Sequence, residues 1–361
     1  MIYLVLFFFF SFLSLIELNV EDRAAKINLA AAFSVSTLFL IIMAGTRTIG
    51  FDYTNYAYLY EVLNIHNYLE NTVEVGYALI TELAKRAGLS FNQFLLLIAF
   101  FGVGLKMLFL FRWSSNWFLS LTYYFAIGFT VNEMGQIRHG LAIGIVLLAF
   151  ADLFRENYRG FFFKTFIAFL FHASALIVFP VYFLVRKKNI PPLILLLSLI
   201  PFLTLVFIDL KTFIQLIIDY LPLTQVQAKL SYYVLSEEYG NHLGFNLSLC
   251  LRLIFLLVVY RYHSLGKSRY YYYDTLWKLY YFGVVLYMVF NSIGDIAIRS
   301  SLYFKTLECL IIPMIVSLGK GRLEKNILWV IMILYSFWSL YKIVFDPAFS
   351  ESYLPYKSIL F

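Results

Sequence analysis

The sequence predicts an all-α protein that crosses a membrane many times, and three observations support this. Hydrophobic residues make up 62% of the 361 residues and charged residues only 14%, with a mean hydropathy of +0.79. Soluble domains average about 25% charged residues. Apolar runs near the length of a spanning helix recur along the whole chain. Because no polar segment is long enough for a soluble domain, we predict one integral membrane domain over residues 1–361.

The apolar segments follow one another with mostly short connections. They lie at roughly 1–18, 27–44, 92–111, 117–132, 137–154, 161–185, 190–209, 245–260, 275–293, 296–317 and 327–345. The first has no basic start and no small-residue cleavage site, so we predict a retained helix and not a signal peptide. The two cysteines lie in apolar segments, which argues against a disulfide framework.

Basic residues indicate the orientation, because cytoplasmic loops are enriched in Lys and Arg. With the N-terminus outside, the early loops obey this rule. If every later segment crosses, the basic clusters at 186–188, 261–269 and 320–325 all fall outside. One change, at segment 161–185, moves all three clusters into the cytoplasm.

That change requires segment 161–185 to break at His172 into two half-helices that enter and leave on the cytoplasmic side. Non-helical backbone at membrane depth is tolerated where protein buries it or where it lines a wet cavity. His172 would then lie at the apex of a re-entrant hairpin. The alternative is a straight helix with His172 bonded to a neighbouring hydroxyl. We favour the hairpin, which gives about ten spanning helices and places both termini outside.

Two longer outer regions remain, at 45–91 and 210–244. The second mixes apolar and polar residues at roughly helical spacing, which predicts one or two amphipathic helices in the membrane interface.

Three arginines fall at the outer ends of predicted spanning helices: Arg47, Arg138 and Arg299. A guanidinium offers a planar fork of donors that suits phosphate oxygens, so three of them at one depth could hold a diphosphate. The alternative for each is an interfacial arginine or a local pair, such as Asp295–Arg299 at i, i+4.

Candidate acids, bases and sugar-contacting residues surround these arginines. The titratable candidates are Asp52, Glu74, Glu133, His139 and His172, and the aromatic ones are Tyr53, Tyr56, Tyr77 and Tyr303. Glu74 has a simpler explanation as a first-turn carboxylate favoured by the helix dipole.

Several familiar site motifs are missing from the sequence. There is no Gly-rich phosphate loop, no HExxH and no Cys/His cluster, so we expect no cofactor and no metal. A soluble nucleotide-sugar transferase domain is also missing. Any glycosyl donor must therefore arrive through the membrane, and we expect no nucleic-acid partner.

Five short motifs occur in order: GxDYxxY after Arg47, ExGY from Glu74, IRxGLA from Ile137, FHxSAL from Phe171 and IRxxxYF from Ile298. Together they resemble the EpsG-like, Wzy-type polysaccharide polymerases of bacteria over essentially the whole chain. The region 210–244 varies among members, so the resemblance does not identify the sugar.

The resemblance implies an inner-membrane glycosyltransferase that builds O-antigen or a related surface polysaccharide. Its donor and acceptor would be undecaprenyl-diphosphate-linked oligosaccharides, used at the periplasmic face without a metal. Membrane lipids, a chain-length regulator and a flippase would be its partners.

In that role the arginines would bind the diphosphate and its developing charge. We rank His172 first as the general base, Asp52 second and Glu74 third. His139 and the tyrosines would contact the substrate. An O-antigen ligase and a lipid-linked sugar flippase or exporter are the rival functions.

Overall fold

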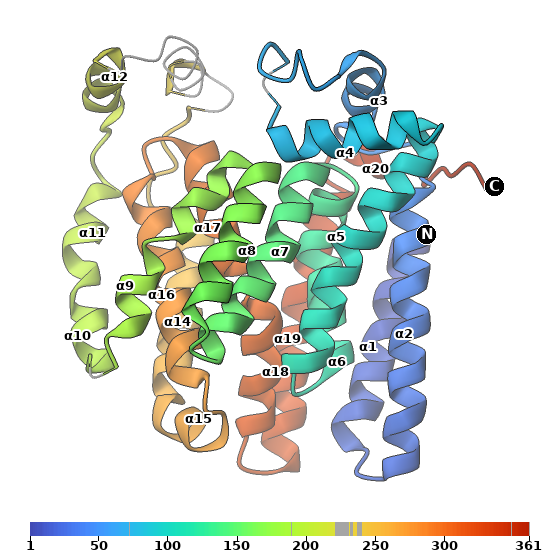
Figure 1. Cartoon of the computed structure of the whole chain (residues 1–361). Coiled ribbons are helices and arrows are strands. Elements are labelled where there is room, and N and C mark those ends of the chain that lie inside the picture. Colours follow the sequence, from blue (N-terminus) through green and yellow to red (C-terminus); the bar gives the residue numbers. More distant parts are fainter. Residues whose placement is uncertain are drawn as a thin grey trace. The chain divides into compact units, whose positions relative to one another are not determined.

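The computed structural model describes residues 1–361 except 72, 189, 221–230, 232–233, 237–239, 348 and 361. The described residues are helical, with no strand among them and one isolated antiparallel bridge, Arg47 to Ser358. Figure 1 shows the helices and their order along the chain. The predicted all-α, polytopic membrane class is confirmed.

The chain divides into two compact units. Unit 1 comprises Met1–Leu176 and Glu308–Phe361, and unit 2 comprises Ile177–Leu307. Each unit is described by itself, and the single membrane domain stays a prediction.

Unit 1 contains the helices on both sides of the unit 2 insertion. They are α1 (Ile2–Asn19), α2 (Arg23–Gly45), α3 (Tyr53–Val62), α4 (Val75–Arg86), α5 (Phe91–Trp113), α6 (Trp117–Tyr124), a π-helix (Phe125–Glu133), α7 (Ile137–Phe154), α8 (Tyr158–Phe171), α18 (Glu308–Leu318), α19 (Arg322–Val344) and α20 (Ser350–Tyr353).

Unit 2 contains shorter helices. They are α9 (Val181–Arg186), α10 (Pro192–Leu197), α11 (Leu199–Leu205), α12 (Lys211–Asp219), α14 (Leu247–Arg261), α15 (His263–Arg269), α16 (Tyr273–Val289) and α17 (Gly294–Lys305). Within this unit α16 packs against α14 and α17.

Five described helices are long and apolar enough to span a membrane: α1, α2, α5, α7 and α19. The number rises to seven if two bent pairs, α14 with α15 and α17 with α18, each form one span. The protein is therefore a multi-pass membrane protein. The predicted count of about ten spans, and the periplasmic placement of both termini, stay predictions.

The predicted break at His172 is confirmed. Helix α8 ends at Phe171, and His172 adopts an extended backbone with φ −155° and ψ 117°. A 3-10 helix, Ala173–Val178, follows. Whether segment 161–185 re-enters the membrane or crosses it stays a prediction.

Helix α7 is the most deeply buried of the five spans, because other helices pack around it. Nearly all of its residues from Ile137 to Phe154 are buried, and α5 and α8 both pack against it. Its first turn carries Arg138 and His139, so its neighbours determine where these two side chains lie.

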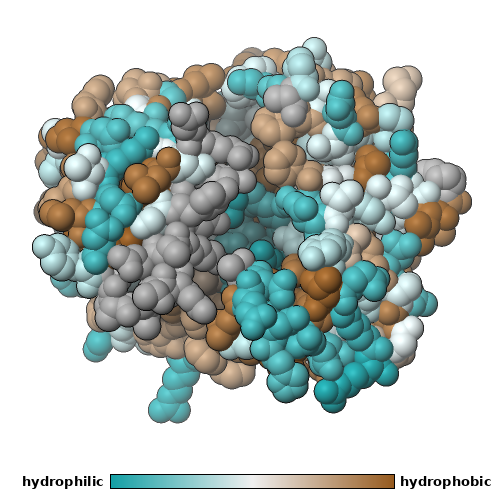
Figure 2. Space-filling view, turned by 90° about the horizontal axis from the view of Figure 1, so that it is seen from above, coloured by the Kyte–Doolittle hydropathy of each residue, from teal (hydrophilic) through white to brown (hydrophobic). Residues whose placement is uncertain are grey.

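The two predicted outer regions contain short helices. Residues 45–91 form α3 and α4, and α4 buries Tyr77, Ala78, Thr81 and Ala84 along one face, as expected of an amphipathic helix. Figure 2 looks onto the end of the molecule that carries α3 and α4, where many hydrophilic residues gather. In region 210–244, α12 is helical, and most of 221–239 lies outside the described residues.

Residues 353–360, which we call the C-terminal strap, pair with the end of α2. The Thr48 amide donates to Lys357 O at 3.0 Å and the Ile359 amide donates to Thr46 O at 2.9 Å. The Tyr356 hydroxyl donates to Met43 O at 2.8 Å. The bridge between Arg47 and Ser358 places the strap directly over Arg47.

Candidate active site

The Glu74 carboxylate joins two parts of unit 1. Arg138 Nη1 at the start of α7 donates to Glu74 Oε2 at 2.6 Å, and the Ala173 amide donates to Glu74 Oε1 at 3.1 Å. Both side chains are largely buried, at 13% and 23% exposed for Glu74 and Arg138. Because Ala173 directly follows His172, one carboxylate fixes both Arg138 and the break after α8.

This arrangement bears on the role of Glu74. Both of its oxygens already accept hydrogen bonds, one from the Arg138 guanidinium and one from the Ala173 amide. Glu74 also directly precedes α4, so the helix dipole favours its charge as the sequence indicated. The geometry therefore favours an orienting role for Glu74 over a proton-accepting one.

The two histidine rings are in contact and tilted relative to one another. The ring centroids of His139 and His172 are 4.6 Å apart with an interplanar angle of 31°. His172 Nδ1 lies 2.7 Å from Ser174 Oγ, and His139 Nδ1 lies 3.4 Å from Gln136 Oε1. His139 is buried and His172 is partly exposed. The structure therefore brings two of the predicted candidate residues, from α7 and from the break after α8, into ring contact.

Arg47 is completely buried between α2 and the loop before α7. Its Nε donates to Met134 O at 3.2 Å and its Nη1 to Ala44 O at 3.4 Å, while Nη2 has no hydrogen-bond partner among the described residues. The Tyr53 ring lies 5.8 Å from the guanidinium carbon. Burial lowers the pKa of Arg47 to about 10, so the group stays charged at neutral pH.

Glycine at position 50 makes this close packing possible. Gly50 has φ +137°, a backbone angle that residues other than glycine rarely adopt. A Cβ at this position would lie 2.0 Å from Met134 O. The loop after α2 therefore reaches Met134, to which Arg47 donates.

Tyr77 lies close to both Arg47 and Arg138. The Arg138 guanidinium carbon is 5.8 Å from the centre of the Tyr77 ring. Burial raises the pKa of Tyr77 well above its usual value, and both arginines oppose that shift. The Tyr77 hydroxyl is buried with no hydrogen-bond partner among the described residues. The structure thus brings two of the three predicted arginines to one tyrosine.

The remaining aromatic candidates lie in the same unit. The Tyr56 and Tyr77 ring centroids are 6.1 Å apart, and the Tyr53 hydroxyl is 3.3 Å from Asn92 Oδ1. Asp52 directly precedes α3, is partly exposed, and makes no side-chain capping bond there. Its carboxylate interacts electrostatically with Tyr353 of the C-terminal strap.

Arg299 and Tyr303 belong to unit 2. Arg299 Nε lies 2.8 Å from Asp295 Oδ2, so the local i, i+4 pair that the sequence indicated is confirmed. Tyr303, one turn further along α17, is fully buried. A diphosphate clamp that combines Arg299 with Arg138 stays a prediction.

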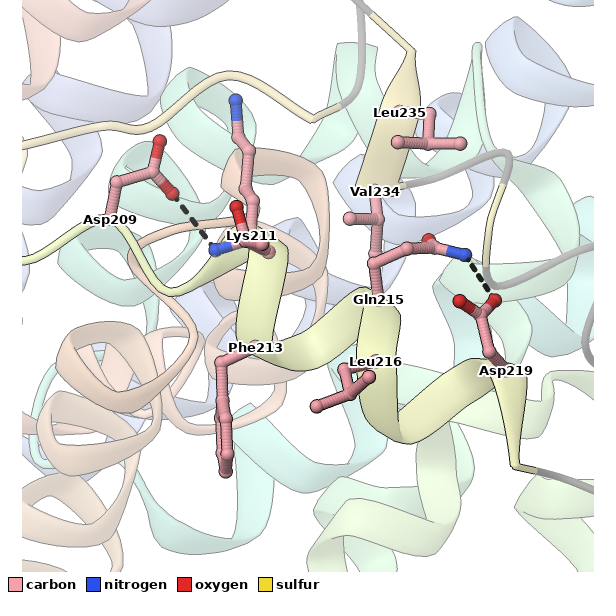
Figure 3. Close-up of a pocket in the computed structure, with 9 residues that line it drawn as sticks. Asp209, Lys211, Phe213, Gln215, Leu216, Asp219, Val234 and Leu235 are labelled. Atoms are coloured by element: carbon pink, nitrogen blue, oxygen red, sulfur yellow. Dashed lines mark hydrogen bonds between the residues drawn. The ribbon is translucent and has the colours of Figure 1, made fainter.

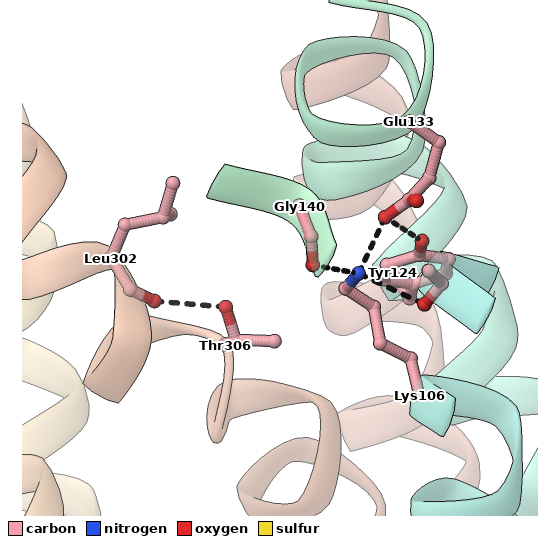
Figure 4. A network of polar contacts seen from close by, with 7 residues as sticks. Lys106, Tyr124, Glu133, Gly140, Leu302 and Thr306 are labelled. Atoms are coloured by element: carbon pink, nitrogen blue, oxygen red, sulfur yellow. Dashed lines mark hydrogen bonds and ion pairs between the residues drawn. The ribbon is translucent and has the colours of Figure 1, made fainter. Parts of the chain in front are cut away.

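Sequence reasoning missed Lys106, which is buried in the middle of α5. Its Nζ lies 2.6 Å from Glu133 Oε1, and Tyr124 also donates to that oxygen at 2.8 Å (Figure 4). Glu133 ends the π-helix and had been a candidate acid or base. The sequence signal that could have identified Lys106 is a single lysine within a long apolar helix. A charged residue inside a membrane is costly and usually has a function.

A separate cavity of about 720 Å³ lies in unit 2 beside α12 (Figure 3). Its polar side chains are engaged locally, with Gln215 Nε2 donating to Asp219 Oδ1 at 2.7 Å. It contains none of the predicted site residues. Among the described residues, no three His, Cys, Asp or Glu side chains are grouped to hold a metal ion.

Comparisons with known proteins give one match. The model of the EpsG family matches residues 30–358, nearly the whole chain. No curated protein matches the chain. No solved structure matches it either.

Proposed function

The chain belongs to the EpsG family, and on that premise we propose that it polymerises undecaprenyl-diphosphate-linked oligosaccharide repeat units by glycosyl transfer. Family membership supports a membrane polysaccharide polymerase-like role. The lipid diphosphate donor, the O-antigen-type product and the periplasmic face of the inner membrane are parts of the proposal.

One observation carries the proposed chemistry: Glu74 binds both Arg138 and the amide that follows His172, and the His172 ring contacts that of His139. A transferase with a diphosphate leaving group needs fixed cationic donors and a base within one site. The proposal assigns both to unit 1, where the contacts of Glu74 join residues 99 positions apart in sequence.

In the proposed reaction an acceptor hydroxyl oxygen attacks the anomeric carbon of the donor sugar. The bond from that carbon to the diphosphate oxygen breaks, and its electron pair stays on the diphosphate. Arg138 stabilises the charge that develops there, since preorganised donors act most strongly in a water-poor site. Arg47 and Arg299 are the second and third cationic groups in this proposal.

The acceptor proton passes to His172. The proposal requires the tautomer in which Nδ1–H donates to Ser174 Oγ, 2.7 Å away, because the basic lone pair is then on Nε2. In this proposal His139, whose ring centroid is 4.6 Å away, stabilises the imidazolium that forms. Asp52 is the second candidate for the base.

The tyrosines provide the surface for the sugars. Tyr53, Tyr56 and Tyr77 lie together in unit 1, and aromatic faces suit the C–H faces of sugar rings. The Tyr77 hydroxyl and Arg47 Nη2 are buried without partners among the described residues, which fits polar atoms that a substrate completes. Tyr303 has the same proposed role in unit 2.

The test is reconstitution of the purified full chain with lipid-linked repeat units, followed by gel analysis of the products. A ladder of multiples of one repeat supports the proposal. No lengthening of any lipid-linked repeat would contradict it. In cells, gene deletion should leave a single capped repeat, whereas loss of all lipid A-linked sugar would indicate a ligase or a flippase.

A further inference from the structure

The ion pair between Lys106 and Glu133 is the most deeply buried one among the described residues, with side chains 1% and 3% exposed. Lys106 Nζ also donates to Gly102 O at 3.0 Å and to Gly140 O at 2.5 Å (Figure 4). The three hydrogens of the ammonium thus reach three elements: α5, the π-helix and α7. A buried ion pair seldom maximises the stability of a protein, since replacing it with apolar residues of similar volume often leaves the stability unchanged or raises it.

The pair lies next to the residues proposed to act on the substrate. Gly140 follows His139 directly and Arg138 by two positions, so its carbonyl belongs to the first turn of α7. At the other end of the connection, Met134 follows Glu133 and accepts from Arg47 Nε. Lys106 therefore contacts both ends of the segment from Glu133 to Gly140, and Arg47 contacts it at Met134.

The π-helix adds to this constraint. Its i→i+5 pattern continues past Glu133, with the Gln136 amide donating to Val131 O at 2.8 Å. π-helical turns are uncommon and are frequent at functional sites. The widened turn directs Glu133 towards α5, where a Cβ on Gly102 would lie 2.5 Å from Glu133 Oε2. The approach depends on glycine there.

We propose that Lys106 and Glu133 are positioning residues that fix the first turn of α7, and with it Arg138 and His139. This inference rests on the proposed function for its catalytic meaning, because the residues it positions are the proposed diphosphate-binding and imidazole groups. Lys106 and Glu133 themselves touch no substrate atom in this proposal.

The decisive variant removes the network without leaving a buried charge. Lys106→Met, Tyr124→Phe and Glu133→Leu together replace it by apolar groups of similar size. The expected result is a thermal midpoint near that of the wild type, a polymerisation rate lower by about tenfold or more, and faster amide hydrogen exchange in residues 134–141.

A matched control tests whether any ion pair on α7 has this effect. Lys164 and Asp152 pair at the other end of α7, far along the chain from Arg138. Lys164→Met with Asp152→Leu should leave the rate and the exchange of 134–141 near wild-type values. An equal loss in both variants overturns the inference, as does an unchanged rate and exchange in the triple variant.

Tyr124→Phe alone covers the case in which the triple variant fails to fold. It removes one donor to Glu133 Oε1 and should lower the rate about two- to tenfold. An unchanged rate overturns the inference. The exchange measurement needs no substrate, so it tests the positioning role separately. If the wild type makes no polymer, the proposed function is contradicted. If the variant still exchanges faster in residues 134–141, the positioning role is supported all the same.

Discussion

Glu74 and Arg138 are 64 positions apart in sequence and form an ion pair of 2.6 Å between Oε2 and Nη1. The other Glu74 oxygen accepts from the amide that follows His172. The arginine proposed to bind the diphosphate and the proposed base therefore share one support. A change at Glu74 should affect both functions together, which distinguishes it from an isolated surface pair.

Glu74→Gln should lower the polymerisation rate about 10- to 100-fold, because hydrogen bonds to charged groups contribute about 1.5–3 kcal/mol. The amide keeps one accepting oxygen but loses the charge that orients Arg138. The rate is measured on purified chain with lipid-linked repeats. Glu82→Gln, which breaks the exposed pair with Arg86, is the control and should have the wild-type rate.

Arg138→Lys should abolish long polymer while the protein still inserts. A point charge cannot replace a planar fork that contacts Glu74 and a phosphate at once. Arg299→Lys should act in the same direction. Gel analysis of chain length measures both. Arg86→Lys, at an exposed arginine, should change nothing, and wild-type chain lengths from both test variants would remove the argument for bidentate binding.

His172→Ala should reduce transfer about 10²–10⁴-fold, the usual contribution of a general base, and leave donor binding largely intact. His172→Gln separates two roles, since an amide can replace an orienting hydrogen bond and cannot accept the proton. His66→Ala, at an exposed position, serves as the control. If His172→Ala polymerises at near the wild-type rate, Asp52 becomes the base.

A cysteine placed at position 188 should resist an impermeant thiol reagent added from outside. The expectation follows from the re-entrant form of segment 161–185, which keeps 186–188 cytoplasmic. A cysteine in place of the exposed Tyr58, in the predicted outer region, is the positive control. Ready labelling at 188 would show that the segment crosses.

Gly50→Ala should destabilise the protein by about 1–3 kcal/mol or more, because a Cβ there meets Met134 O and the φ of +137° is strained. Thermal unfolding in detergent measures this. Gly104→Ala, where a Cβ meets no atom within 4 Å, should be neutral or slightly stabilising. Equal stability of the two variants would show that the Gly50 contact matters little.

Local signals in the sequence predicted part of this structure. The length of the apolar runs predicted the helical membrane class, because run length is a local property of the sequence. The distribution of basic residues predicted the break at His172, because it follows a general rule about membrane orientation. The Asp295–Arg299 pair followed from helical spacing.

The remaining features depend on tertiary packing. The Glu74–Arg138 pair joins α4 to α7, and no spacing rule relates them. The ring contact between His139 and His172 depends on how α7 and α8 pack. The π-helix has no established sequence pattern. Lys106 is a single charge in a long apolar run, and the sequence does not show that it pairs with Glu133.

During translation, Arg47 is synthesised long before the C-terminal strap that covers it. Thr46 and Ser358, which meet through their hydroxyls at 2.9 Å, are 312 positions apart. At about 5–20 residues per second the ribosome needs roughly 15–60 s to make that stretch. Until then the Arg47 guanidinium has no strap above it and must stay hydrated at the membrane surface, because a buried charge without its partners is costly. A nascent chain therefore lacks the finished enclosure of Arg47 until synthesis is nearly complete.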